Sequence, residues 1–122
     1  MSSLTARSAG ATATLVVVLL ALTASVAAGS HARVTKDTVG AKEFSFSLST
    51  RSISKPGQVT FTVKNRGSIL HNFKINGKST ANLQPGKTAH LSVSFKKKGR
   101  YRYLCTEPGH AAAGMRGVFT VR

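Results

Sequence analysis

The sequence has few acidic residues and almost no cysteine. Only 3 of its 122 residues are acidic, against 18 lysines and arginines, so the formal net charge is +15. This balance is far too basic for an ordinary cytosolic enzyme, and the length allows one domain at most. Internal repeats, low-complexity tracts and, beyond the N-terminal segment, helical periodicity of useful length are also missing. The core must therefore come from short extended segments.

The chain begins with the pattern of an export signal, which we expect to occupy residues 1–28. A basic residue in a short polar region precedes an apolar run and then small residues. We expect cleavage after Ala28, with Ala27 and Ser30 as neighbouring alternatives. An uncleaved segment would instead remain as a membrane anchor, because residues 8–30 carry no charge and are long enough to span a bilayer. Either way, the protein is expected to be periplasmic, secreted or at the cell surface.

The exported part keeps nearly all of the positive charge. Cleavage removes only Arg7, which leaves 17 basic residues against the three acids Asp37, Glu43 and Glu107. Such a charge attracts anionic partners, so we expect an acidic protein partner and consider an anionic membrane or cell-wall surface. No nucleic-acid-binding motif is present. The simpler alternative is that the charge only keeps the domain soluble.

Short stretches of alternating apolar and polar residues follow one another along the rest of the chain. They cover residues 43–49, 58–64, 69–75, 88–95, 101–105 and 117–121, and Pro-Gly and Asn-Gly pairs mark turns between them. Short strands with such turns predict an all-β fold, an antiparallel sandwich or barrel. We expect residues 43–122 to form this domain, and residues 29–42 to be a flexible lead-in or a first edge strand.

The only cysteine lies in a pattern typical of a metal site. Cys105, His110 and Met115 follow one another with four residues in each gap, between two expected strands. A lone cysteine in an exported chain is a free thiol, an intermolecular bridge or a metal ligand. A thiolate, a thioether and an imidazole together favour copper, and a blue-copper site needs a second imidazole. His71, at the start of an alternating run, is the best candidate.

Each of these residues has a simpler alternative when it is considered alone. Cys105 would more often be a small buried hydrophobic residue, Met115 part of the core, and His71 a hydrogen-bonded residue at the rim of the core. Their joint spacing favours the metal site. His90 and His31 are expected to be surface residues, although cleavage after Ser30 would make His31 an N-terminal chelator for a second copper ion.

Several motifs together resemble the cupredoxins, the small blue copper proteins. They are residues 59–67 leading to His71-Asn72-Phe73, residues 103–110, and Gly114-Met115, with ligand spacing nearer to auracyanin and azurin than to plastocyanin. The resemblance implies a Greek-key β-sandwich over residues 43–122 that binds one type 1 copper ion. It assigns His71, Cys105 and His110 as equatorial ligands and Met115 as the axial one. It also implies a hydrogen bond from Asn72 to Thr106, whereas the missing disulfide makes the plant-type subgroup a poor match.

Four protein ligands leave no open position for a substrate, so we expect an electron carrier and not an enzyme. The protein would be a monomer that carries single electrons between redox partners by Cu(I)/Cu(II) cycling. We expect a partner to dock on a small uncharged rim beside His110, formed by Pro108, Ala111, Ala112 and Ala113. The alternatives are a copper chaperone or scavenger at the cell surface without an electron-transfer role, and an accessory domain of a larger oxidase.

Overall fold

The computed structural model describes residues 1–5, 9–13, 25, 29 and 33–122. The predicted cleavage site, most of the predicted export signal and His31 lie outside the described residues. No helix that is long and apolar enough to cross a membrane is found among the residues that the structure describes.

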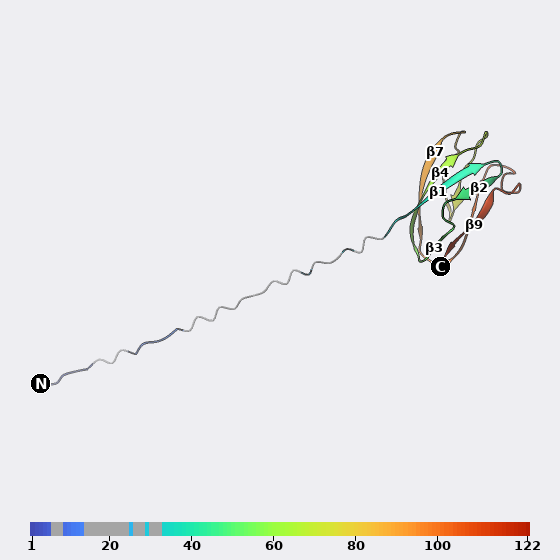
Figure 1. The fold of residues 1–122 in the computed structure, drawn as a ribbon. Helices are drawn as coiled ribbons and strands as arrows, with labels where there is room; N and C mark the ends of the chain where they lie inside the picture. Colours follow the sequence, from blue (N-terminus) through green and yellow to red (C-terminus); the bar gives the residue numbers. More distant parts are fainter. Residues whose placement is uncertain (6–8, 14–24, 26–28, 30–32) are drawn as a thin grey trace.

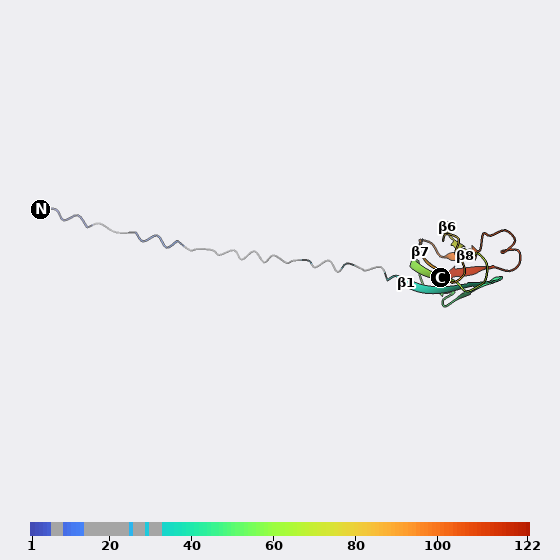
Figure 2. The same ribbon diagram turned by 90° about the horizontal axis from the view of Figure 1, so that it is seen from above.

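Nine strands within residues 33–122 form two sheets that pack face to face (Figure 1). The first sheet has the order β2 (Ser45–Leu48), β1 (Thr35–Lys42), β4 (Gly57–Asn65) and β7 (Thr88–Phe95). The second has the order β3 (Ser52–Ile53), β9 (Arg116–Val121), β8 (Gly99–Leu104), β5 (Lys74–Ile75) and β6 (Lys78–Ser79). Seen from above, β1 and β8 lie in different layers, and the loop between β8 and β9 extends from one end (Figure 2).

The predicted all-β sandwich is confirmed, but its sheets are mixed. β1 pairs with β4 in parallel and β3 pairs with β9 in parallel, whereas the other strand pairs are antiparallel. The expectation of an antiparallel arrangement throughout was therefore wrong for two pairs. The reason is that the chain leaves the first sheet after β2, adds β3 to the second sheet and returns as β4 beside β1.

The largest correction concerns residues 29–42. Residues 35–42 are neither a lead-in nor an edge strand, because β1 lies between β2 and β4 in the interior of its sheet. Its inward side chains are Asp37, Val39 and Ala41. A carboxylate and a methyl group on the inward face give no apolar alternation, which is why the sequence did not distinguish an interior strand from an edge strand or a lead-in. The folded domain thus begins near Thr35 and not at residue 43.

A large apolar core lies between the sheets. Phe61 is fully buried at its centre and contacts the rings of Phe73, Phe95 and Phe119, at centroid distances of 5.2, 6.4 and 5.6 Å. Tilted and edge-on ring pairs of this kind each add about 0.5–1.5 kcal/mol beyond the area they bury. Phe46 packs against this core and also against a second, smaller cluster. The core therefore supports that second cluster directly.

Candidate copper site

The second cluster contains Ala41, Cys105 and Met115 and lies at the end of the sandwich from which the β8–β9 loop extends. Strand β8 leads directly into Cys105, and Met115 directly precedes β9. The backbone N–H of Cys105 donates to the carbonyl of Met115 over 3.1 Å, and that of Met115 donates to the carbonyl of His110 over 3.0 Å. These bonds close the loop on itself. Gly109 and Gly114 take φ values of 80° and 118°, which other residues rarely adopt.

His71 approaches the loop from the opposite side. It lies three residues before the start of β5. Its backbone N–H and carbonyl form an antiparallel bridge with Leu83, at N–O distances of 3.2 and 2.8 Å. The side-chain amide of Asn65, at the end of β4, donates to the carbonyls of Leu83 and Ile69 over 2.7 Å each. Because the backbone is held on both sides, the imidazole of His71 has a fixed position, and it is entirely buried.

The structure brings the four predicted ligands together. One potential ligand atom each from His71, Cys105 and His110 lies within 4.8 Å of the others, and Sγ of Cys105 is 3.5 Å from Nδ1 of His110. Met115 is fully buried in the same cluster as Cys105. His110 is the only member of the histidine–cysteine group that is partly exposed. Two segments far apart in the sequence, the one carrying His71 and the β8–β9 loop, therefore meet at one point.

The donor atoms fit a copper ion. Nδ1 of His71 is buried and has no hydrogen-bond partner within the described part of the chain, while Nε2 of the same ring lies 3.2 Å from a carboxylate oxygen of Glu43. A buried polar atom without a partner is costly, and a metal ion beside it would remove that cost. Two imidazoles, one thiolate and one thioether form the donor set that selects copper over harder ions. This orphaned nitrogen is therefore accounted for by an ion between the four side chains.

Asn72 links the two ligand-bearing segments. Its Oδ1 accepts from the backbone N–H of Thr106 over 2.8 Å, and its Nδ2 donates to Oγ1 of Thr106 over 2.6 Å, so the predicted hydrogen bond is present. Nδ2 also donates to Oδ1 of Asn82 over 2.7 Å. The backbone N–H of Asn72 donates to Sγ of Cys105 over 3.5 Å. Hydrogen bonds of this kind hold the ligands in place and tune the metal.

Glu43 contacts the site, although the sequence analysis treated it only as one of three acids. One of its oxygens accepts hydrogen bonds from the backbone N–H groups of Ser68 and Ile69, over 2.7 and 3.0 Å, and from Nε2 of His71. Bonds from its own backbone N–H and from that of Ser68 lower the pKa of Glu43 to about 2, aided by those from Ile69 and His71. The scarcity of acids was the signal that could have drawn attention to this residue.

Several uncharged residues lie near the exposed part of His110, although Glu107 also lines the pocket beside this ring. Pro108, Ala112 and Ala113 are exposed and Ala111 is half-buried, as the docking hypothesis requires. Two further members could not be predicted from the sequence: Phe44, which is 42% exposed and packs edge-on with its ring centroid 5.0 Å from that of His110, and Ile69, which is 41% exposed. We call these six residues the apolar rim. Phe44 was expected on the buried face of a strand, but β2 begins only at the next residue.

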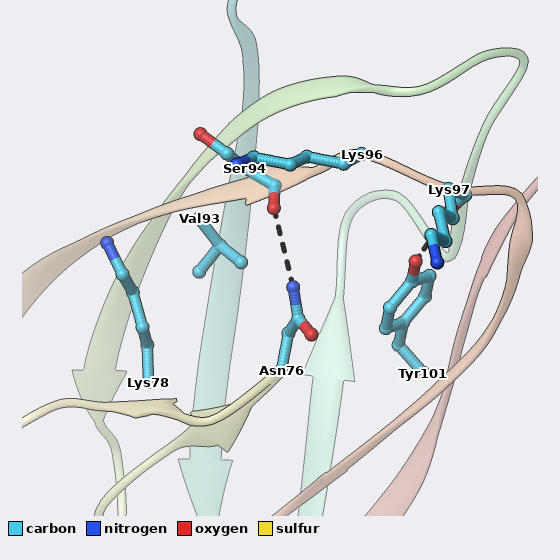
Figure 3. Close-up of a pocket in the computed structure, with 7 residues that line it drawn as sticks. All are labelled: Asn76, Lys78, Val93, Ser94, Lys96, Lys97 and Tyr101. Atoms are coloured by element: carbon cyan, nitrogen blue, oxygen red, sulfur yellow. Dashed lines mark hydrogen bonds between the residues drawn. The ribbon is translucent and has the colours of Figure 1, made fainter.

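Away from the copper end, a shallow groove lined by lysines lies between β6 and β7, the outer strands of the two sheets (Figure 3). Lys78, Lys96 and Lys97 line it, and Asn76 crosses it by donating to the carbonyl of Ser94 over 3.4 Å. We call it the lysine groove. His90 also lies away from the copper ligands, where it is exposed and 3.1 Å from the hydroxyl of Thr62, so its prediction as a surface residue is confirmed.

Comparisons with known proteins agree with this geometry. Residues 12–121 match the family model described as a cupredoxin-like domain. The chain is 45% identical over 40 residues to the copper-resistant cuproprotein CopI of Pseudomonas aeruginosa, which covers 33% of this chain and 22% of the relative. It spans only about a fifth of the length of the first curated relatives that it matches.

Solved structures share the fold. Dithionite-reduced auracyanin from Roseiflexus castenholzii matches with a TM-score of 0.65 and 22% identity, over 75% of this chain and 98% of that one. The copper-containing nitrite reductase of Thermus scotoductus matches with a TM-score of 0.58 and 18% identity, over 74% of this chain but only 28% of the enzyme. With the family match and the donor set together, the chain belongs to the cupredoxin-like family and holds one copper ion at a type 1 site formed by His71, Cys105, His110 and Met115.

Proposed function

We propose that this protein is an exported electron carrier that cycles its copper between Cu(I) and Cu(II). The observation that supports this most strongly is that the fold alone fixes the ligand set. His71 is held by its backbone bridge to Leu83, and the loop from Cys105 to Met115 is closed by its own hydrogen bonds. Because the ligands are held in place, little has to move when an electron arrives, and transfer is fast.

The closed donor set argues against catalysis by this chain. Four side chains converge on one point, three of them almost fully buried, which leaves no position where a substrate could bind the metal. Nitrite reductase carries the same fold within a longer chain, of which the match covers 28%. We infer that the present chain exchanges electrons with partners and does not itself transform a substrate.

We propose that electrons enter and leave through the imidazole edge of His110. This ring is the one partly exposed ligand, and the apolar rim around it offers a flat, uncharged contact. Such a surface suits a brief encounter, because few charges have to lose their hydration when the partner docks. The redox partner would then sit directly above the ligand that carries the electron.

The partner is proposed to be acidic, with the protein acting as a monomer. Its positive charge would steer an acidic partner weakly and in a strongly salt-dependent way. The lysine groove and the copper site lie at opposite ends of β4. Ser94, which lines the groove, pairs with the start of this strand, whereas Ala41 at the copper end pairs with Asn65 at its other end. A membrane or cell-wall anion bound at the groove would therefore leave the rim open to the partner.

The docking proposal is tested by Ala112→Glu, with Lys97→Glu as its matched control. A carboxylate in the rim should slow electron exchange with the partner, or with a small anionic oxidant, and leave the copper spectrum unchanged. Lys97→Glu makes a larger change in net charge far from the rim, so it should have the smaller effect at physiological salt. If both variants slow the exchange equally, the net charge of the protein controls the rate. That result would contradict the proposed docking site.

The alternative function is copper handling without electron transfer, which the name of the copper-resistant relative favours. Voltammetry of the copper-loaded protein separates the two. A carrier should cycle reversibly at a moderate positive potential and keep its metal in both oxidation states. A chaperone or scavenger should instead give up Cu(I) to a competing chelator on reduction, and that result would reject the electron carrier.

A further inference from the structure

We propose that Glu43 is a positioning residue for the copper site: its carboxylate selects the ring nitrogen through which His71 binds the metal, and its negative charge favours Cu(II). The proposal rests on the copper site, and its second half rests on the proposed redox function. Glu43 itself does not coordinate the ion in this account. It acts through the imidazole of His71.

The carboxylate of Glu43 contacts the buried ring of His71. Oε1 of Glu43 lies 3.2 Å from Nε2 of His71, on the opposite side of the ring from Nδ1. The ring is completely buried, and the Glu43 side chain is only 23% exposed, so water has little access to the contact. The same oxygen is fixed by the backbone N–H groups of Ser68 and Ile69. The carboxylate is therefore held in place by three donors from a single loop.

This contact determines the imidazole tautomer. A neutral imidazole has one N–H and one lone pair, and an ionised carboxylate can only accept a hydrogen bond. The hydrogen on the ring must therefore be on Nε2, which leaves Nδ1 as the lone-pair nitrogen. That atom is buried without a hydrogen-bond partner among the described residues. Glu43 thus prepares the nitrogen that a metal requires before the metal arrives.

The chain makes room for this carboxylate. A Cβ atom at Gly67 would collide with the carboxylate of Glu43, whereas the backbone of Gly67 is free of positive φ and does not need glycine for its conformation. The N–H of Gly67 donates to Oδ1 of Asn65 over 2.9 Å, which sets the turn that follows β4. Glycine at this position is therefore explained by the space that Glu43 occupies.

The carboxylate also has an electrostatic effect. A negative charge hydrogen-bonded to a ligand stabilises the more highly charged Cu(II) state and makes the ligand a stronger donor. Only two other acids exist in the chain, and neither forms a hydrogen bond with a ligand side chain among the described residues. Replacing Glu43 with a neutral hydrogen-bond acceptor should consequently raise the reduction potential.

The tautomer is tested on the metal-free protein by nitrogen-15 NMR of the His71 ring at mildly alkaline pH. The wild type should show a protonated Nε2 and an unprotonated Nδ1. Glu43→Gln should keep that tautomer, because its carbonyl oxygen still accepts, whereas Glu43→Ala should give a mixture. Gly67→Ala displaces the carboxylate without removing its charge and should also give a mixture. A wild-type ring protonated on Nδ1, or no change in either of the last two variants, overturns the proposal.

The charge is tested on the copper-loaded protein. Glu43→Ala should weaken copper binding roughly 10- to 100-fold, in line with the loss of hydrogen-bond partners at other metal sites. Glu43→Gln should keep the thiolate-to-copper absorption and raise the potential, and by more than Glu107→Gln, which removes the same charge from the ligand loop. Loss of the absorption in Glu43→Gln would show that the carboxylate is itself a ligand, and equal shifts in the two variants would show only a general charge effect. The NMR measurement does not depend on whether the protein transfers electrons. A failure of the proposed electron transfer can therefore be distinguished from a failure of this proposal.

Discussion

The interior between the sheets and the copper end of the sandwich differ in the kinds of side chain that they bury. In the interior, four phenylalanine rings contact one another and carry no polar atom. At the copper end, sulfur atoms, two imidazoles and a buried asparagine converge, and Nδ1 of His71 has no partner. The comparison indicates that apolar packing stabilises the interior, whereas the polar side chains at the copper end are arranged to bind an ion.

A substitution in the apolar core alone is the strongest test of this comparison. Phe61→Ala should lower the free energy of unfolding by about 3–5 kcal/mol, because it removes a fully buried ring that three other rings contact. Urea denaturation of the metal-free protein measures the loss. Phe44→Ala is the matched control: its ring is 42% exposed, so stability should change far less. Similar losses in the two variants would contradict the assignment of the core.

The next largest effect should come from the metal. Copper at about a hundred times its dissociation constant should stabilise the fold by about 2.7 kcal/mol, because the four ligands meet only in the folded chain. Thermal unfolding with and without copper measures this gain. Cys105→Ser should remove most of the gain and leave the metal-free protein nearly as stable as the wild type. A large loss in the metal-free variant would show that Cys105 matters mainly for packing.

A smaller effect is expected at the contact between the two ligand segments. Asn72→Ala should lower stability by about 1–2 kcal/mol in total, because it removes the partly buried hydrogen bonds with Thr106 and Asn82. It should also broaden the copper spectrum, because the segments carrying His71 and Cys105 are no longer linked. Chemical denaturation and visible absorption measure the two effects. An unchanged spectrum would show that the β8–β9 loop holds its own shape.

The smallest effect concerns Asp37, a buried carboxyl group outside the copper site. Burial raises its pKa above the ordinary 3.8, despite the hydrogen bonds from Ser49 and Thr50, and its Oδ2 has no partner. The folded state therefore favours the protonated form, so this contribution to stability is complete below pH 3.8 and is lost as the pH rises through the folded-state pKa. Denaturation from pH 3 to 7 should show wild-type stability falling relative to Asp37→Asn. A constant difference would contradict the raised pKa.

The sequence predicted most of the fold because alternation and turn residues are local signals. The strands of residues 57–65 and 88–95 appear nearly where the alternation of Val59, Phe61 and Val63 and of Leu91, Val93 and Phe95 placed them. The interior position of β1 could not be predicted, because its buried face includes Asp37 and Ala41, whose burial depends on neighbouring strands. The pattern of residues within the strand does not show that neighbouring strands will bury these side chains.

The ligands could be predicted for the same reason, and their surroundings could not. Three ligands lie on one loop at fixed spacing, and His71 begins a recognisable alternating run. Glu43 reaches His71 across 28 positions, and Phe44 reaches His110 only because the chain turns before β2. Contacts of this kind depend on tertiary structure, which residue types and spacing do not specify.

The most direct test of the account is a titration of the purified protein with Cu(II), followed by visible absorption. The account predicts an intense thiolate-to-copper band that saturates at one copper per chain and is absent in Cys105→Ser and strongly altered in His71→Ala. A protein that binds copper without this band, or that keeps the band after Cys105 is replaced, would contradict it.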